Sequence, residues 1–251
     1  EVTLSLHDAL PISERLRGKV FQARPQGRPG IVGDHADAQR RRFGLVIALR
    51  GVCHAFGEMF GRFVAHVNAE GKGLVQINLV GGPSAIPSLE QGNAVRTGVL
   101  DIAAVPPSFY AGNMPEADAV IMSPLSFKQQ RASGAWDALN KITNQKMNSW
   151  YLATYGEGIP FHIWTSKPPT SANFQGWKLR TVPNYTAFFQ ALGAAPITMP
   201  PGEVKTALER GVVDGYGWPL IGIFDLGWHE KTKFRLEPGF YTIELGIQLE
   251  L

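Results

Sequence analysis

The chain has 251 residues, of which 44% are hydrophobic and 18% charged, a balance typical of globular proteins and not of disordered ones. No apolar run approaches the ~20 residues of a membrane-spanning helix, and the single cysteine, Cys53, excludes an intrachain disulfide and a cysteine-based metal cage. The net charge of +3 comes from one block, because residues 14–50 hold nine Lys/Arg against three Asp/Glu.

The basic block has two functional interpretations and one that involves no function. Clustered arginines are typical of a basic segment that binds nucleic acid or a membrane surface. This block, however, lacks amphipathic spacing and an aromatic platform. Residues 5–13, SLHDALPIS, resemble a translated sequencing-adapter read-through, and the stretch after them resembles a gene read in the wrong frame. We therefore expect residues 1–53 to be a non-native or disordered segment, and we predict no nucleic-acid binding and no membrane insertion.

From Phe56 onward the pattern predicts alternating helices and strands. The elements expected up to residue 155 are a helix from Phe56 to a stop at Gly71, a strand over 74–80, a helix opened by a capping box at Ser88 and ending near Gly98, a buried strand over 99–105, a rigid loop at Pro106–Pro107–Ser108, a long helix over 127–147 and a strand over 150–155.

The second half continues the alternation. The expected elements are a strand over 161–165 separated from its predecessor by GEGIP, a short helix near 171–174, a strand over 177–182, a helix over 185–192, a strand over 195–199, a helix from Pro200 to Arg210 and a last block, 212–214, that leads into GYGWP. This order predicts an α/β fold with mostly parallel sheets. In such sheets ligands bind at the carboxyl ends of the strands, and Arg180, Tyr110 and Trp218 fall at such ends.

Signatures of catalysis and of metal binding are missing from the sequence. The six histidines lie far apart, and there is no nucleophile elbow, phosphate-binding loop or dinucleotide fingerprint. Glu157 is either a buried base or a solvated loop acid, and Asp214 caps or hydrogen-bonds a turn. We predict no cofactor, no metal and no catalytic residue.

The residues that remain are those of a binding protein. Arg180, in the stretch GWKLRTVPNYTAFFQALG (176–193), carries a planar fork of donors that matches a carboxylate. The alternative for Arg180 is a surface ion pair with an acid such as Glu203. Aromatic residues form either the walls of a ligand pocket or part of the core: Tyr110, Tyr155, Phe161, Tyr216 and Trp218.

Two stretches that overlap this segment resemble the DctP-type solute-binding proteins of TRAP (tripartite ATP-independent periplasmic) transporters. They are FQGWKLRTVPN (174–184) and FFQALGAAPITMPPGEVKTALERGVVDGYGWP (188–219). The upstream INLVGG and LEQGNAVRTGVLDIAAV are similar to the same family. The resemblance covers residues from about 55 to 251. Because the family continues with further helices, we expect the chain to be a C-terminally truncated fragment.

The resemblance implies a periplasmic binding protein-like fold with two α/β lobes, hinge strands and a ligand cleft between the lobes. We expect lobe I at residues 54–156, lobe II at 157–242, and the start of a strand crossing back to lobe I at 243–251. It also implies a periplasmic receptor that binds a small organic acid and delivers it to a TRAP membrane permease. The rival interpretation is a two-lobe enzyme, such as a lyase or transferase, acting on a small carboxylic acid.

Within that family Arg180 matches the arginine that pairs with the ligand carboxylate. Trp218 stands where several relatives place an asparagine, and Pro160 stands where sialic-acid receptors have a second arginine, so this chain departs from the sialic-acid pattern. An indole wall suggests a ligand with an apolar or aromatic part, or a less polar oxo acid. The complete set of predicted ligand-binding residues is Arg180, Trp218, Tyr216, Tyr110, Ser108, Tyr155, Phe161 and Asn184.

Overall fold

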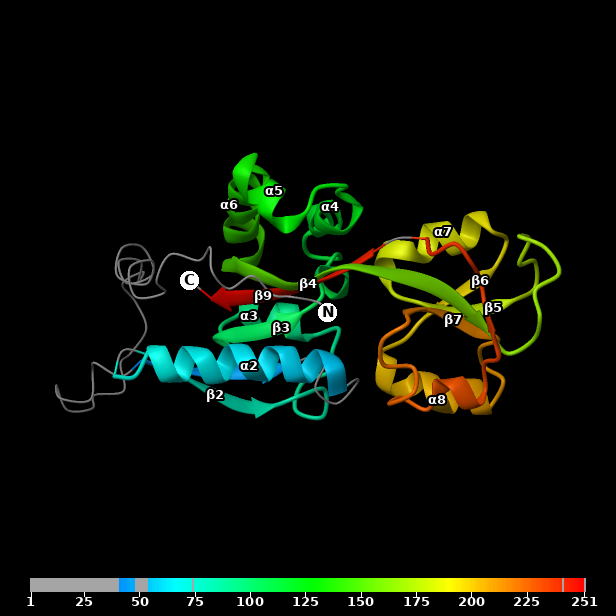
Figure 1. The fold of residues 1–251 in the computed structure, drawn as a ribbon, viewed down its shortest axis with the longest axis horizontal. Helices are drawn as coiled ribbons and strands as arrows, with labels where there is room; N and C mark the ends of the chain where they lie inside the picture. Colours follow the sequence, from blue (N-terminus) through cyan, green and yellow to red (C-terminus); the bar gives the residue numbers. More distant parts are fainter. Residues whose placement is uncertain (1–40, 48–53, 74, 241, 251) are drawn as a thin grey trace.

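Two α/β lobes are joined by two strands that cross from one to the other (Figure 1). The computed structural model describes residues 41–47, 54–73, 75–240 and 242–250. Strand β4 (Ser149–Thr165) pairs antiparallel with β9 (Thr242–Glu250) over its first part and with β7 (Gly215–Pro219) over residues 161–165. β4 therefore belongs to the sheets of both lobes and links them covalently.

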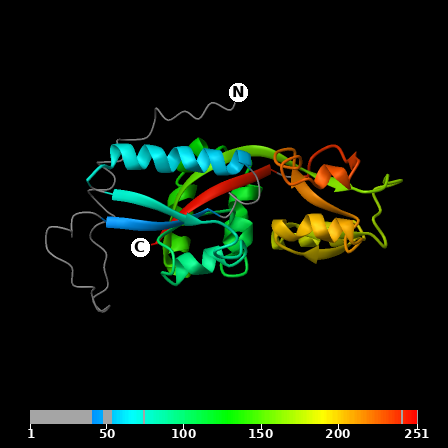
Figure 2. The same ribbon diagram turned by 90° about the horizontal axis from the view of Figure 1, so that it is seen from below.

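Lobe I holds the sheet order β2-β1-β3-β9-β4. β1 pairs parallel with β2 and β3, and β3 pairs antiparallel with β9. The helix α2 packs against β2 and α3 against β3, on opposite faces of these strands (Figure 2). The elements of lobe I before β4 are β1 (Arg41–Ile47), α2 (His54–Glu70), β2 (Val75–Gly81), α3 (Gln91–Arg96), β3 (Ile102–Val105), η2 (Pro107–Phe109), η3 (Pro115–Ala117), α4 (Asp118–Met122), α5 (Phe127–Ala132) and α6 (Ala135–Met147).

Lobe II continues the sheet in the order β4-β7-β5-β6, with β5 parallel to both β6 and β7. Its two α-helices, α7 and α8, lie on opposite sides of these strands (Figure 1). Leu179, Phe189 and Val204 are buried between the layers. The remaining elements are β5 (Lys178–Thr181), η4 (Pro183–Tyr185), α7 (Thr186–Ala191), β6 (Ala195–Thr198), α8 (Pro201–Glu209), η5 (Trp228–Glu230) and β8 (Phe234–Arg235).

The two-lobe α/β fold predicted from the sequence is confirmed, with a mixed sheet. Strands pair in parallel inside each lobe, and the antiparallel pairs occur where β3, β4, β7, β8 and β9 meet. Among the described helices none is long and apolar enough to cross a membrane.

Several predicted boundaries were wrong. The predicted helix over 127–147 breaks into α5 and α6 at Gly134, whose φ of 82° is incompatible with a right-handed helix. Ser88 makes no capping box, since the N-cap of α3 is Glu90. Residues 171–174 form a bend followed by irregular structure, and GYGWP is itself the strand β7.

The two strands expected on either side of GEGIP are one continuous strand, β4. Gly158 has a φ of 68°, and the register with β9 shifts between residues 156 and 159. These irregularities bend the strand without ending it, because β9 continues to pair with it on both sides of the bend.

The N-terminal segment expected to be non-native or disordered contains one described element. Residues 41–47 form β1, which lies between β2 and β3, so regular structure begins before residue 55. Residues 1–40 and 48–53, including Cys53, lie outside the described residues.

We expect Gly215→Ala to lower the free energy of unfolding by about 1–3 kcal/mol, because an added Cβ would lie 2.2 Å from the carbonyl oxygen of Trp164 on β4. Gly61→Ala is the matched control, since a Cβ there meets nothing within 4 Å. In the middle of α2 the control should raise stability by about 0.5–1 kcal/mol. Urea denaturation of both variants checks this, and equal midpoints would contradict the close approach of β7 to β4.

Candidate ligand-binding site

Arg180 is fully buried, with 0% of its side chain exposed. It is the third residue of β5, which lies between β6 and β7. Glu203, the partner considered for a surface ion pair, is exposed in the first turn of α8. The surface ion-pair interpretation of Arg180 is therefore wrong, because the guanidinium is enclosed within lobe II.

Two protein groups hold the guanidinium in place. Its Nε donates to the carbonyl oxygen of Met199 at 3.0 Å, and its Nη1 donates to the hydroxyl of Tyr185 at 3.1 Å. The Tyr185 hydroxyl in turn donates to the carbonyl oxygen of Gly217 at 3.1 Å. The third nitrogen, Nη2, is buried and meets no acceptor among the described residues. A buried charged donor without an acceptor costs more than the ~1–3 kcal/mol of a neutral one, so this position favours an anion.

Tyr185 is the member of this group that the sequence reasoning missed. It ends the short helix η4, whose first residue is Pro183, immediately after β5. Gly217 makes room for the ring, because a Cβ at that position would lie 2.9 Å from Cε2 of Tyr185. The signals that could have identified Tyr185 were its position five residues after Arg180 and the glycine in GYGWP.

Burial raises the pKa of Tyr185, and the neighbouring Arg180 guanidinium partly opposes this rise. The phenol therefore stays protonated at neutral pH. It can accept a hydrogen bond from Arg180 while donating its own proton to Gly217, which fixes the orientation of both side chains.

Trp218 lies close to the guanidinium, and Phe161 lies next to Trp218. Cζ of Arg180 is 5.5 Å from the Trp218 ring centroid, and the rings of Phe161 and Trp218 are 6.3 Å apart. The indole nitrogen of Trp218 donates to the carbonyl oxygen of Ile221 at 3.0 Å. The indole therefore presents its π face to Arg180, an arrangement typical of a cation–π contact.

Tyr216, also on β7, is part of the core of lobe II. It is 0% exposed, its hydroxyl lies 2.8 Å from that of Thr232, and its ring packs edge-on against Trp228. Burial raises the pKa of its phenol. The polar atom of Tyr216 is therefore already engaged inside the lobe.

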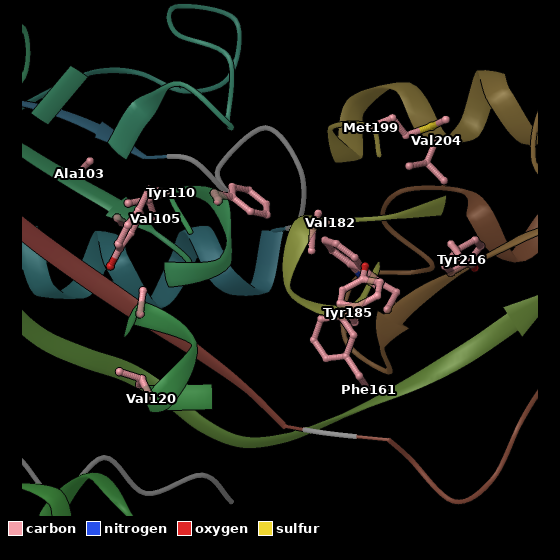
Figure 3. Close-up of a cluster of buried hydrophobic side chains, with 14 of the residues drawn as sticks. Ala103, Val105, Tyr110, Val120, Phe161, Val182, Tyr185, Met199, Val204 and Tyr216 are labelled. Carbon is pink, nitrogen blue, oxygen red and sulfur yellow. The ribbon is translucent and has the colours of Figure 1, made fainter. Parts of the chain in front are cut away.

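Ser108 and Tyr110 come from the η2 region of lobe I, which lies against η4 of lobe II. Ser108 is within η2 and Asn184 within η4, so these two predicted residues stand at the contact between the lobes. Tyr110 belongs to the core of lobe I near Val105 (Figure 3). A Cβ at Gly92 would lie 2.6 Å from Cβ of Tyr110. The side chain of Tyr155 lies outside the described residues.

The acids considered as catalytic bases have structural partners. Glu157 is exposed and accepts a hydrogen bond from the backbone nitrogen of Phe127 at 2.6 Å. Asp214 accepts one from the backbone nitrogen of Lys178 at 2.9 Å and pairs with Lys167 at 3.2 Å. Over the described ranges no three His, Cys, Asp or Glu side chains gather in a group that could hold a metal ion.

The family model for bacterial extracellular solute-binding proteins, family 7 (DctP), matches residues 54–247. The chain belongs to this family, which confirms the predicted resemblance to TRAP solute-binding proteins. The family is one of receptors and not of enzymes.

The chain covers less than half of the length of each curated relative that it matches. A monocarboxylate 2-oxoacid-binding periplasmic protein of Nostoc is 26% identical over 166 residues, 62% of this chain and 45% of the relative. The chain spans between 26% and 46% of the length of the curated relatives it matches.

Solved structures confirm the fold. A Bordetella pertussis extracytoplasmic solute receptor binding pyroglutamic acid aligns with a TM-score of 0.72 and 18% identity, covering 84% of this chain and 71% of that one. A TRAP periplasmic solute-binding protein of Pseudoalteromonas atlantica, with bound sodium and pyruvate, aligns with a TM-score of 0.73 and 18% identity, covering 84% and 67%.

We expect Tyr185→Phe to lower the free energy of unfolding by about 1–3 kcal/mol, because it leaves both Nη1 of Arg180 and the Gly217 carbonyl without this partner. The ring and its packing are kept. Tyr216→Phe, the matched control, removes a neutral hydrogen bond to Thr232 and should cost about 1 kcal/mol. Denaturant titration of both variants checks the order, which would be contradicted if Tyr185→Phe were the milder change.

Alkaline pH should destabilise the protein through its buried phenols. Burial raises the pKa values of Tyr110, Tyr185 and Tyr216 in the folded state, whereas unfolded tyrosines ionise near pH ~10. The contribution of these phenols is complete below about pH 10 and is lost as the pH rises above it. The free energy of unfolding should therefore fall as the pH rises above about 10. Tyr216→Phe should reduce the slope, and an unchanged slope would contradict this origin.

Proposed function

We propose that this protein is an extracytoplasmic receptor that binds a small organic acid through Arg180. The observation that carries the proposal is the fully buried guanidinium whose Nε and Nη1 are held by Met199 and Tyr185, while Nη2 has no acceptor in the described structure. A carboxylate is the anionic group whose geometry matches this fork.

The hydrogen bonds indicate which edge of the guanidinium binds the acid. Nε is engaged by Met199, so a carboxylate cannot use the edge formed by Nε and Nη2 without displacing that contact. We infer that it approaches the edge formed by Nη1 and Nη2, because Nη2 has no acceptor among the described residues. Tyr185 and Gly217 hold the guanidinium in this orientation before the acid arrives, which reduces the entropy cost of binding.

The second part of the proposal is closure of the two lobes on the acid. The lobes are linked by β4 and β9 and also touch through η2 and η4. A ligand that contacts both lobes binds the closed arrangement better and shifts the population toward it. In this proposal Ser108 from lobe I and Asn184 from lobe II, which belong to the touching segments η2 and η4, complete the site. Trp218 lies beside Arg180, and Phe161 lies next to Trp218.

The family and its relatives support the transport role. The family consists of extracellular solute-binding proteins, and the relatives named above bind a 2-oxoacid, pyroglutamic acid or pyruvate. We infer that the receptor works in the periplasm and delivers its acid to a TRAP membrane permease. The enzyme alternative would need a free base beside Arg180, and both acids considered for that role are engaged elsewhere.

We expect Arg180→Ala to weaken binding of the cognate acid by about 2–5 kcal/mol, because a desolvated carboxylate is left unpaired. Arg210→Ala is the control, since Arg210 is exposed at the end of α8. The measurement follows tryptophan fluorescence while mono- and dicarboxylates, oxo acids and aromatic acids are added. A response lost only in Arg180→Ala supports the receptor. Equal responses of the wild type and Arg180→Ala, or turnover of the acid, would refute it.

A further inference from the structure

In lobe II the surroundings of Arg180 combine one positive charge with three side chains, Tyr185, Tyr216 and Trp218, whose polar atoms are already engaged. We propose that the ligand of this receptor is a monocarboxylate with an apolar body, and not a dicarboxylate. This inference rests on the proposed function and deepens it, because it assigns a chemical class to the acid that Arg180 would bind.

The first argument is the balance of charge. Among the lysines and arginines between residues 57 and 240 whose burial the structure describes, Arg180 alone is buried. The two half-buried members of this group have other partners: Arg131 lies over the rings of Phe127 and Trp136, and Lys205 pairs with Glu230 at 3.3 Å. A second ligand carboxylate beside Arg180 would find no buried cation there, and an unpaired buried charge is strongly unfavourable.

A buried histidine does not supply the second charge. His162, on β4, is 3% exposed, but its Nδ1 lies 3.3 Å from a carboxylate oxygen of Glu237. A protonated His162 would therefore already be compensated by that carboxylate. Arg235 lies on the opposite side of Glu237, at 2.7 Å, so this group is a network of its own.

The second argument is the use of hydrogen-bonding groups. The hydroxyl of Tyr185 bonds Arg180 and Gly217, and the indole nitrogen of Trp218 donates to Ile221. The hydroxyl of Tyr216 bonds Thr232. These three polar side chains have no donor left for a second anionic group. Together with Phe161, these side chains present aromatic rings in lobe II. Aromatic rings favour a ligand whose body is apolar or unsaturated.

Matched pairs of acids test the inference by isothermal titration calorimetry on the full chain. Each pair has a monocarboxylate with an apolar body and a dicarboxylate of similar size: 4-methyl-2-oxopentanoate with 2-oxoglutarate, and benzoate with phthalate. We expect the monocarboxylate of at least one pair to bind at least about tenfold more tightly than its partner. Arg180→Ala should abolish its binding, and the Arg210→Ala control should leave it unchanged.

The outcomes separate this inference from the proposed function. Dicarboxylates that bind as tightly as their partners or more tightly, and lose binding in Arg180→Ala, would overturn the inference while the receptor function stands. Binding that is equal in the wild type and in Arg180→Ala would overturn the anchor role of Arg180 and the inference with it. Absence of binding by every acid would overturn both.

Discussion

A guanidinium that is removed completely from water must be solvated by the protein or by a ligand, and much of lobe II follows from this requirement. Arg180 finds two acceptors in the carbonyl oxygen of Met199 and the hydroxyl of Tyr185. The first lies at the end of β6 and the second in η4, so the charge fixes how both segments meet β5. Gly217 must lack a side chain for Tyr185 to fit. One buried charge therefore constrains positions spread over three strands.

Arg180 is also connected, through Tyr185, to the strands that join the lobes. The ring of Phe240, which precedes β9, lies 5.6 Å from that of Tyr185 and 5.9 Å from that of Phe161 on β4, and it stacks on Phe188 of α7 at 4.9 Å. The side chain that orients Arg180 thus belongs to the same ring cluster as the start of one crossing strand and the middle of the other. A shift of Tyr185 would therefore alter the packing of Phe240 and Phe161, where the two lobes are linked.

Local patterns predicted the elements that depend on local chemistry. The helix α8 follows from the proline pair at its start, and Arg180 was identified because a strand ends at Pro183 just after it. The hydroxyl of Tyr185 is oriented by a hydrogen bond to the carbonyl oxygen of Gly217, 32 residues away in the sequence. Strand β4 is continuous because β9 pairs along it on both sides of its bend. Such contacts between distant segments are not visible in local periodicity, so the sequence indicated the anchor but not the group that orients it.

For the aromatic residues, too, the local sequence did not distinguish a core position from a pocket wall. Tyr110, Tyr216 and Trp218 all stand at or near strand ends, and their types are equally suited to a core and to a pocket wall. What separates them is the place of the ring in the fold. Tyr110 packs on α3 of lobe I, Tyr216 bonds Thr232 inside lobe II, and only Trp218 lies over the guanidinium. Because Arg180 and Trp218 both belong to lobe II, the proposed function implies that an acid engages Arg180 before the lobes close. In that proposal closure adds the contacts of lobe I, so lobe II would determine mainly which acid binds, and both lobes would determine the stability of the closed state.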